Sequence, residues 1–345
     1  MKKLIYLCLA VFLIAVSCKE DPDPIQEFEP PICTDTYVKK SYQYEVVGFY
    51  PSWRHSVLPI ESVKWDKLTR VIYCFAVPAV NGGLSTGELF LASQLVSTAH
   101  ANGVEAVFSI GGAAGSSTFV DAVSTPEKRK NMIERILTFL GNNCFDGVDI
   151  DYETYSAQLP DNILTDFMKD LYAELPQYGY SISIDVYPSG WSGKKVSDEV
   201  VDLVDYVYIM GYNFSGPWSD PGPHSSYEQC IGSGNTSSST GLAYWANYRG
   251  WDKNKLVLGV PFYGRDFDVD GGKPITYKDI IALDPTAAYV NQWNNIYYDG
   301  IDAVTRKAEY IVANNFPGMM IWELGQDAGV DSLSLLTAMD GVLNP

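Results

Sequence analysis

Short runs of apolar residues alternate with longer amphipathic segments from Tyr44 to the end of the chain. The runs are rich in Val, Ile, Leu and aromatic residues, which is typical of parallel strands buried on both faces. We therefore predict eight strands: Val46–Tyr50, Thr69–Ala76, Glu105–Ile110, Gly147–Tyr152, Tyr180–Tyr187, Tyr206–Met210, Leu256–Pro261 and Gly318–Trp322.

The segments between these strands repeat apolar residues at helical spacing. The clearest of them are residues 126–140, 161–175, 301–314 and 330–343. Pro126 behind Thr125 is a favoured helix start, and Asp161 is the predicted N-cap of the second helix. Eight strand–helix units in about 300 residues predict an α/β fold, a single (β/α)8 TIM barrel with its functional residues at the carboxyl ends of the strands. A long loop at 211–238 and a short insertion at 265–300, after the seventh strand, interrupt the pattern.

The amino terminus predicts export. Lys2 and Lys3 precede an apolar stretch, Leu4 to Val16, that is too short to span a bilayer. The stretch ends in Ala15-Val16-Ser17-Cys18, which resembles the lipobox of bacterial lipoproteins, although Ala15 stands where Leu is usual. We expect a signal peptide at 1–17, a flexible lipid-anchored linker at 18–43 and the barrel at 44–345. Ordinary secretory cleavage beside an incidental Cys18 is the alternative.

The residues directly after Cys18 also predict where the protein is located. Lys19-Glu20-Asp21 is similar to the acidic export tag of surface lipoproteins in the Bacteroidetes. The expected location is therefore the outer membrane, with exposure at the cell surface, and the lipid on Cys18 is the expected contact with the membrane.

Charge and rare residues exclude several function classes. The chain has 24 Lys and Arg against 42 Asp and Glu, a net charge of −18, so nucleic acid is not an expected partner. Three scattered His argue against a His-based metal site or a Ser-His-Asp triad. Cys33, Cys74, Cys144 and Cys230 lack metal-ligand spacing, and Cys74 and Cys144 lie in apolar stretches that predict buried thiols. We expect a monomer without metal or cofactor.

Three acidic residues at alternate positions carry the candidate chemistry. In Asp146-Gly147-Val148-Asp149-Ile150-Asp151-Tyr152-Glu153, side chains alternate between strand faces, so Asp149, Asp151 and Glu153 point the same way, roughly 6–7 Å apart along the strand. Buried unpaired carboxylates cost free energy and have raised pKa values, which a general acid needs. A Ca²⁺ site or a solvated acidic strand is the alternative, but a rigid strand does not offer the flexible oxygen ligands that Ca²⁺ prefers.

This segment resembles the DGxDxDxE motif of family 18 glycoside hydrolases, the chitinases and their relatives. Other stretches are similar to the family in the same order: VVGFYPSW at 46–53, SIGG at 109–112, MGYN at 210–213, GVPFYGR at 259–265 and GMMIWELGQD at 318–327. The resemblance covers about residues 44–343. Ser109 and the two glycines after it are expected to serve close packing near the barrel floor.

The resemblance implies roles for individual residues. Glu153 resembles the proton donor, Asp151 the residue that holds the substrate's acetamido N–H, and Asp149 the acid that tunes Asp151. Tyr212 resembles the hydroxyl that steadies the acetamido carbonyl, and Trp322 the floor of the subsite in which the sugar ring distorts. The remaining expected substrate contacts are Asn213, Tyr50, Phe75, Met210, Trp218 and Tyr263. Asn213 stands where the family usually has Asp, which leaves the pH optimum open.

The implied function is hydrolysis of β-1,4-linked N-acetylglucosamine polymers, with the substrate's acetamido oxygen as nucleophile and retention of configuration. An N-acetylglucosamine-containing glycan is the expected partner. Two alternatives stay open: an endo-β-N-acetylglucosaminidase that acts on N-glycans, and a non-catalytic barrel that binds surface glycans.

Overall fold

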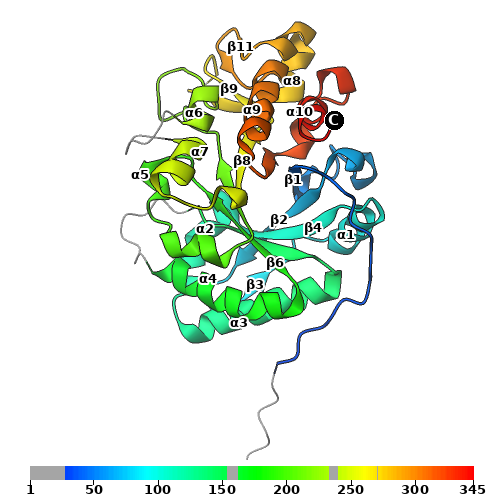
Figure 1. The fold of residues 1–345 in the computed structure, drawn as a ribbon, viewed down its shortest axis with the longest axis vertical. Coiled ribbons are helices and arrows are strands. Elements are labelled where there is room, and N and C mark those ends of the chain that lie inside the picture. Colours follow the sequence, from blue (N-terminus) through cyan, green and yellow to red (C-terminus); the bar gives the residue numbers. More distant parts are fainter. Residues whose placement is uncertain (1–27, 154–161, 233–239, 270) are drawn as a thin grey trace, which may run out of the picture.

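The computed structural model describes residues 28–153, 162–232, 240–269 and 271–345, and its core is a closed barrel of eight parallel strands (Figure 1). The barrel strands are β1 (Glu45–Pro51), β2 (Arg70–Pro78), β4 (Glu105–Gly111), β5 (Gly147–Asp151), β6 (Ser181–Val186), β7 (Tyr206–Met210), β8 (Leu256–Pro261) and β13 (Gly318–Trp322). Each pairs with the next, and β1 pairs with both β2 and β13, which closes the ring. The predicted TIM barrel is confirmed, and each predicted strand overlaps one of these.

The helices cover the outside of the barrel, apart from α8 (Tyr277–Leu283), which lies in the insertion after β8. They are α1 (Ala92–Ala101), α2 (Gly112–Ala122), α3 (Pro126–Asn143), α4 (Ile163–Glu174), α5 (Gly190–Gly193), α6 (Tyr227–Ile231), α7 (Gly241–Ala243), α8 (Tyr277–Leu283), α9 (Ile301–Asn314) and α10 (Leu335–Leu343). Thr125 caps α3 as predicted, by accepting from the N–H of Lys128. The helix predicted over 330–343 begins only at Leu335, because Ser334 is its N-cap. Asp161 lies outside the described residues.

Two short additions interrupt the strand–helix alternation. β3 (Leu84–Ser85) pairs antiparallel with the end of β2. The insertion after β8 is a small antiparallel sheet of β9 (Tyr263–Asp266), β10 (Lys273–Thr276), β11 (Gln292–Trp293) and β12 (Ile296–Tyr297), with α8 between β10 and β11. This sheet and α8 form the upper end of the molecule in Figure 1, where β9, β11 and α8 are labelled. The predicted short insertion is therefore confirmed.

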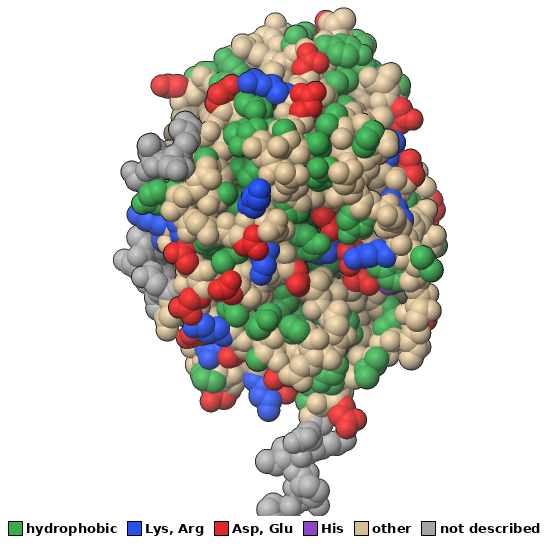
Figure 2. All heavy atoms as spheres, in the orientation of Figure 1, with side chains coloured by type: hydrophobic (Ala, Val, Ile, Leu, Met, Phe, Trp, Pro, Cys, Tyr) green, Lys and Arg blue, Asp and Glu red, His purple; other side chains and the backbone are tan. Residues whose placement is uncertain are grey.

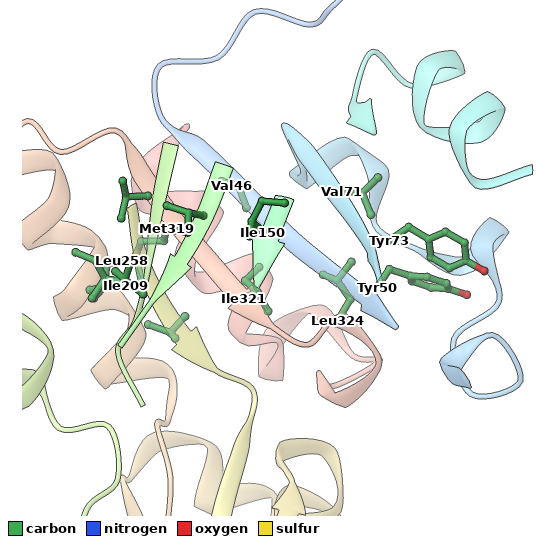
Figure 3. Close-up of a cluster of buried hydrophobic side chains, with 14 of the residues drawn as sticks. Val46, Tyr50, Val71, Tyr73, Ile150, Ile209, Leu258, Met319, Ile321 and Leu324 are labelled. Atoms are coloured by element: carbon green, nitrogen blue, oxygen red, sulfur yellow. The ribbon is translucent and has the colours of Figure 1, made fainter. Parts of the chain in front are cut away.

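The strands separate two apolar layers. The larger one lies between strands and helices and includes Val46, Val71 and Ile150 (Figure 3). The smaller one fills the barrel and includes Val47 and Phe49. Alternate residues of one strand thus belong to different layers, as the pleat requires. Polar residues on the inward positions are therefore the exceptions that need an explanation.

Part of the predicted linker lies against the barrel. Residues 28–43 run along its outside, and Cys33 is disulfide-bonded to Cys144, the residue that ends α3 in the left-handed conformation. In the same segment the ring of Tyr37 stacks on His100 with centroids 3.8 Å apart. The prediction of a buried thiol was wrong for Cys144, because this residue forms a disulfide with a cysteine 111 positions away. It is confirmed for Cys74, which is free and buried. The predicted signal peptide and Cys18 lie outside the described residues.

The visible surface mixes both signs of charge. Figure 2 shows Lys and Arg side chains among Asp and Glu on one face, without a broad area of a single sign. Among the described residues, no helix is long and apolar enough to cross a membrane.

Candidate active site

Three carboxylates follow one another along β5 and just beyond it. Asp149 and Asp151 belong to the strand, and Glu153 follows two residues after its end. Asp149 is completely buried and Asp151 is 5% exposed, whereas Val148 and Ile150 join the outer core. The predicted alternation is confirmed, so the strand carries acidic side chains from the middle of the barrel to its carboxyl end.

Two serine hydroxyls hold the deepest of these acids. Ser109 of β4 donates to Oδ2 of Asp149 at 2.7 Å, and Ser183 of β6 donates to Oδ1 at 2.6 Å. Both serines are the residues paired with Asp149 in the neighbouring strands. Ser109 was expected to serve packing alone, and the structure adds this hydrogen bond. With both oxygens bonded, the carboxylate of Asp149 has one orientation.

A fourth buried acid, Asp185 of β6, was missed from the sequence. It is 3% exposed, and its oxygens have no hydroxyl, amide or cationic partner among the described residues. Its electrostatic neighbours include Asp149 and Asp151. The signal was present, because Ser183 and Asp185 stand two residues apart on one predicted strand and therefore share its inward face.

Burial raises the pKa of each of these acids, and neighbouring carboxylates add to the rise for Asp151 and Asp185. Burial raises the pKa of Asp151 well above its usual range, and the charges of Glu153 and Asp149 raise it further. Burial also raises the pKa of Asp185, with Asp149 and Asp151 adding to the effect. The group therefore binds protons more tightly than separate carboxyls in water would, and it shares them.

Glu153 lies at the open end of this group and is partly exposed. The hydroxyl of Tyr187 donates to its Oε2 at 3.4 Å, and its own backbone N–H donates to Oγ of Ser116 at 2.7 Å. Burial raises the pKa of Glu153, while hydrogen bonds from Tyr187 and from the N–H of Ala113, at the start of α2, oppose the rise. A carboxyl group with a raised pKa that a ligand can reach has the properties of a general acid.

Two glycines of β4 and α2 allow this close packing. Gly111 has φ of +114°, and a Cβ there would lie 2.2 Å from the carbonyl oxygen of Asp151. A Cβ on Gly112 would lie 2.7 Å from the ring of Phe75. The expected packing role of both glycines is confirmed, because any side chain would separate β4 from the acidic strand or displace Phe75, but they lie at the carboxyl end of the barrel and not near its floor.

Tyr212 and Asn213 follow β7 on another side of the barrel mouth. Tyr212 is 7% exposed, and burial raises its pKa well above its usual range, so its hydroxyl keeps its proton. Asn213 has φ of +63°, a conformation that Asn tolerates well. Its Oδ1 accepts from the hydroxyl of Tyr263 at 2.6 Å and from Nη2 of Arg265 at 2.5 Å. An uncharged amide thus ties this loop to β9.

Aromatic rings extend from the barrel interior to its edge. Trp322, the last residue of β13, contacts Phe49 at 5.6 Å between centroids and stacks on Phe75 at 5.8 Å. Phe75 in turn contacts Trp53 at 6.3 Å, and Trp53 is 52% exposed. Met210, expected as a substrate contact, lies in the barrel interior at 7% exposure. Apolar ring faces are therefore available beside the acids.

Tyr50 does not face the site, which corrects the prediction. Its side chain is completely buried between strands and helices, beside Tyr73, and its hydroxyl donates to the carbonyl of Leu58 at 2.6 Å (Figure 3). The pleat gives the inward position to Phe49 instead, which was missed. The motif was placed correctly, but the alternation within it decides which of two adjacent aromatics can meet a ligand.

Trp218 and Tyr263, both expected as substrate contacts, lie near Asn213: Tyr263 donates to it, and Trp218 lies beside Arg265, which also donates to it. Trp218 is 63% exposed, and the guanidinium of Arg265 lies 5.4 Å from the centre of its ring. Tyr263 is 5% exposed and contacts Tyr212 edge to face at 6.2 Å. The structure thus brings every predicted site residue except Tyr50 and the undescribed Cys18 to the carboxyl end or the interior of the barrel.

Comparisons with known proteins give this geometry a context. The model of glycosyl hydrolases family 18 matches residues 45–327. A chitinase-like effector of Moniliophthora roreri is 33% identical over 244 residues, which cover 64% of this chain and 59% of that protein. Endochitinase 1 of Metarhizium robertsii is 28% identical over 272 residues, which cover 67% of this chain and 63% of that protein. The matched regions thus span about three fifths of these relatives.

Solved structures resemble the whole barrel. The GH18 chitinase ChiB from the chitin utilization locus of Flavobacterium johnsoniae is 26% identical, with a TM-score of 0.76, covering 88% of this chain and 94% of that chain. A chitinase from Bacteroides thetaiotaomicron is 27% identical, with a TM-score of 0.78, covering 87% of this chain and 96% of that chain.

Proposed function

Because this chain belongs to glycosyl hydrolases family 18, we propose that it is an active hydrolase of β-1,4-linked N-acetylglucosamine polymers, chitin or chitooligosaccharides. The observation that carries the proposal is Glu153, a carboxyl group with a raised pKa at the mouth of a barrel lined with buried acids. The chitinases similar to this chain support the choice of substrate.

Glu153 is the proton donor of this reaction. Burial raises its pKa and so favours the protonated form that a general acid needs, and its place beyond the strand end lets it reach a glycosidic oxygen. The Tyr187 hydroxyl at 3.4 Å orients the carboxyl group. Protonation of the leaving oxygen makes the sugar a better leaving group, and the carboxylate then draws a proton from the attacking water.

The substrate's own acetamido oxygen is the nucleophile. A retaining glycosidase with an enzyme nucleophile places a second carboxylate about 5 Å from the acid, across the scissile bond. Here the neighbouring acids Asp151 and Asp149 run down into the barrel instead. Oδ1 of Asp151 is buried without a hydrogen-bond partner among the described residues, which leaves it free to accept the acetamido N–H. The protonated Tyr212 hydroxyl donates to the acetamido carbonyl as that oxygen attacks.

Trp322, Phe75 and Trp53 provide the stacking surface for the sugar chain. Sugar rings present apolar faces that pack on aromatic rings, and these three residues form a continuous series of contacts from the floor to the exposed edge. The uncharged Asn213 serves to hold the loop of Tyr212 through Tyr263 and Arg265.

Hydrolysis of chitotetraose, measured beside release of glycans from a high-mannose glycoprotein, tests the substrate class. We expect turnover of the oligosaccharide alone. Glycan release would identify an N-glycan hydrolase, and binding of chitotetraose without turnover would identify a glycan-binding barrel.

The identity of the nucleophile has its own test. Substrate assistance requires an N-acetyl group at the cleaved sugar, so fully deacetylated oligomers should not be cleaved. The first product seen by proton NMR should have the β configuration, and a thiazoline analogue of the cyclised intermediate should inhibit strongly. Equal rates on acetylated and deacetylated oligomers, or an α product, would contradict the mechanism.

The same proposal includes a lipid anchor on Cys18, which rests on the run Ala15-Val16-Ser17-Cys18 and the acidic residues after it. The anchored protein is exported to the outer membrane and faces outward, where polymeric glycans are accessible. Cys18→Ala should move the enzyme from the detergent-extracted membrane fraction to the soluble fraction. Equal membrane retention of both forms would overturn the anchor.

A further inference from the structure

A fully buried lysine lies outside the acidic group, on α9. Nζ of Lys307 donates to Oδ2 of Asp299 at 2.5 Å, to the carbonyl of Ser225 at 2.6 Å and to Oγ of Ser225 at 2.9 Å. Lys307 has no exposed side-chain surface. All three ammonium protons thus have partners, as a charge buried at such cost requires. Lys307 joins α9 to the end of the insertion, at Asp299, and to the loop after β7, at Ser225.

The network continues to the residue before Tyr212. Oγ of Ser225 donates to the carbonyl of Gly211 at 2.7 Å, and Sγ of Cys230 donates to the same carbonyl at 3.0 Å. The same hydroxyl could also donate to Oδ2 of Asp299, but that oxygen is farther away, at 3.0 Å, than the carbonyl of Gly211. Oδ2 of Asp299 also already accepts from Lys307. The ammonium also occupies an acceptor position of the Ser225 hydroxyl. These contacts leave the hydroxyl proton for Gly211.

The neighbouring residue of the same loop, His224, contacts Tyr263. Nε2 of His224 lies 3.1 Å from the carbonyl of Tyr263, and their rings are 5.0 Å apart. Tyr263 donates to Asn213, the residue after Tyr212. Ser225 thus bonds directly to the backbone before Tyr212, whereas His224 is connected to the side chain of the residue after it only through Tyr263.

We propose that Lys307 and Ser225 are positioning residues for the reaction: through the carbonyl of Gly211 they fix the backbone that places the Tyr212 hydroxyl. The inference rests on the proposed function, because Tyr212 matters only if an acetamido carbonyl must be oriented. The stacking surface of Trp322, Phe75 and Trp53 comes from other strands and is unaffected. Loss of the network should therefore lower kcat and leave KM close to that of the wild type.

A double-mutant cycle on chitotetraose hydrolysis tests this. Ser225→Ala removes the hydroxyl donor to Gly211, where Sγ of Cys230 stays as a second donor, and it leaves Lys307 bonded to Asp299 and to the Ser225 carbonyl. It should lower kcat by about 3- to 10-fold, the size expected from one misplaced hydrogen-bonding group. In a Tyr212→Phe background the same substitution should have no further effect, because the hydroxyl that it positions is gone. Lys307→Met combined with Asp299→Asn should act in the same direction and more strongly.

Ser334→Ala is the matched control. Ser334 is likewise a buried serine with a hydrogen-bonded hydroxyl, which donates to Oδ2 of Asp327 at 2.5 Å, but its contacts lead to α10. It should lower the melting temperature about as much as Ser225→Ala and leave kcat unchanged. An equal loss of kcat from Ser225→Ala in the wild-type and Tyr212→Phe backgrounds, or none in either, would overturn the positioning role. A wild-type enzyme that fails to cleave chitotetraose would overturn the proposed function itself.

Discussion

The amino end of the barrel buries Glu45 and Glu105 beside Arg70, whereas Asp151 and Asp185, toward its carboxyl end, are buried beside other acids. Nη2 of Arg70 lies 2.7 Å from Oε2 of Glu105, and Lys39 reaches Oε1 of Glu105 at 2.5 Å. At the carboxyl end, Asp151 and Asp185 have carboxylates as neighbours. The two ends share strands and solvent, so the difference lies in the partners that the sequence supplies.

The pKa values follow this difference. Burial alone would raise the pKa of Glu45, but Arg70 and hydrogen bonds from Thr69, Tyr206 and Tyr42 outweigh burial and lower it. Burial and neighbouring carboxylates instead dominate the pKa values of Asp151 and Asp185, and both values rise. A compensated charge costs the fold little, whereas an uncompensated one is retained only where its proton affinity is useful. This difference agrees with the proposal that the reaction takes place at the carboxyl end, where TIM barrels carry their active sites.

The largest expected effect separates the two ends by activity. Glu153→Gln should lower kcat on chitotetraose by about 10²–10⁴-fold, because an amide cannot donate the proton. Its melting temperature should stay at or slightly above that of the wild type, since one unfavourable buried charge is lost. Glu105→Gln at the other end is the matched control and should do the reverse, lowering stability with kcat unchanged. Retention of more than about a tenth of wild-type turnover in Glu153→Gln would remove it as the proton donor.

Stability should be most sensitive at the amino end. Arg70→Met leaves Glu45 and Glu105 buried without their main cation and should lower the free energy of unfolding by about 3–5 kcal/mol. Arg129→Met breaks only the ion pair with the partly exposed Asp170 and should cost at most about 1 kcal/mol. Urea unfolding followed by tryptophan fluorescence measures both values. A similar loss of unfolding free energy in the two variants would mean that the buried Arg70 stabilises the fold no more than an ordinary surface ion pair does.

The Cys33–Cys144 disulfide holds residues 28–43 near the same end, where Lys39 pairs with Glu105. A cross-link over 111 residues restricts the unfolded chain, and its removal typically costs about 2–4 kcal/mol. The double substitution Cys33→Ser/Cys144→Ser should therefore lower the urea midpoint while kcat of the folded enzyme stays constant. A change in kcat instead would show that the attached segment affects the carboxyl end.

Much of the fold was predictable from the sequence, because strands buried on both faces are continuous apolar runs. The acids of β5 were equally clear, since three carboxylates at alternate positions break such a run. Tyr50 was wrong because the motif was given more weight than the pleat that places Phe49 inside. Asp185 was missed although the same alternation marks it.

Contacts between distant segments could not be predicted in this way. The pairing of Cys33 with Cys144 depends on how residues 28–43 run along the outside of the barrel, and no local pattern encodes that path. The contacts of Lys307 with Asp299 and Ser225 join three separate segments. A lysine in an amphipathic helix would be predicted to be exposed, and the burial of Lys307 follows only from the position of the loop after β7.

The smallest expected effect is a difference in pH dependence, and its sign differs between the ends. The raised pKa of Asp185 means that the folded state binds more protons than the unfolded state once pH exceeds the ordinary carboxyl value near 4. The contribution of Asp185 to the free energy of unfolding therefore falls as pH rises above that ordinary value. The lowered pKa of Glu45 acts oppositely: its contribution is present above the ordinary value and is lost as pH falls below it.

Asp185→Asn and Glu45→Gln separate these contributions when urea unfolding is measured at several pH values. Asp185→Asn removes a group that resists ionisation. Relative to the wild type, the variant should therefore gain stability as pH rises from about 4 to 8. Each unit by which the fold raises the pKa of Asp185 should contribute about 1.4 kcal/mol to this gain. Glu45→Gln should be less stable than the wild type at neutral pH, and its deficit should shrink in acid. If both differences had the same slope with pH, the two ends of the barrel would not differ in how they hold buried charge.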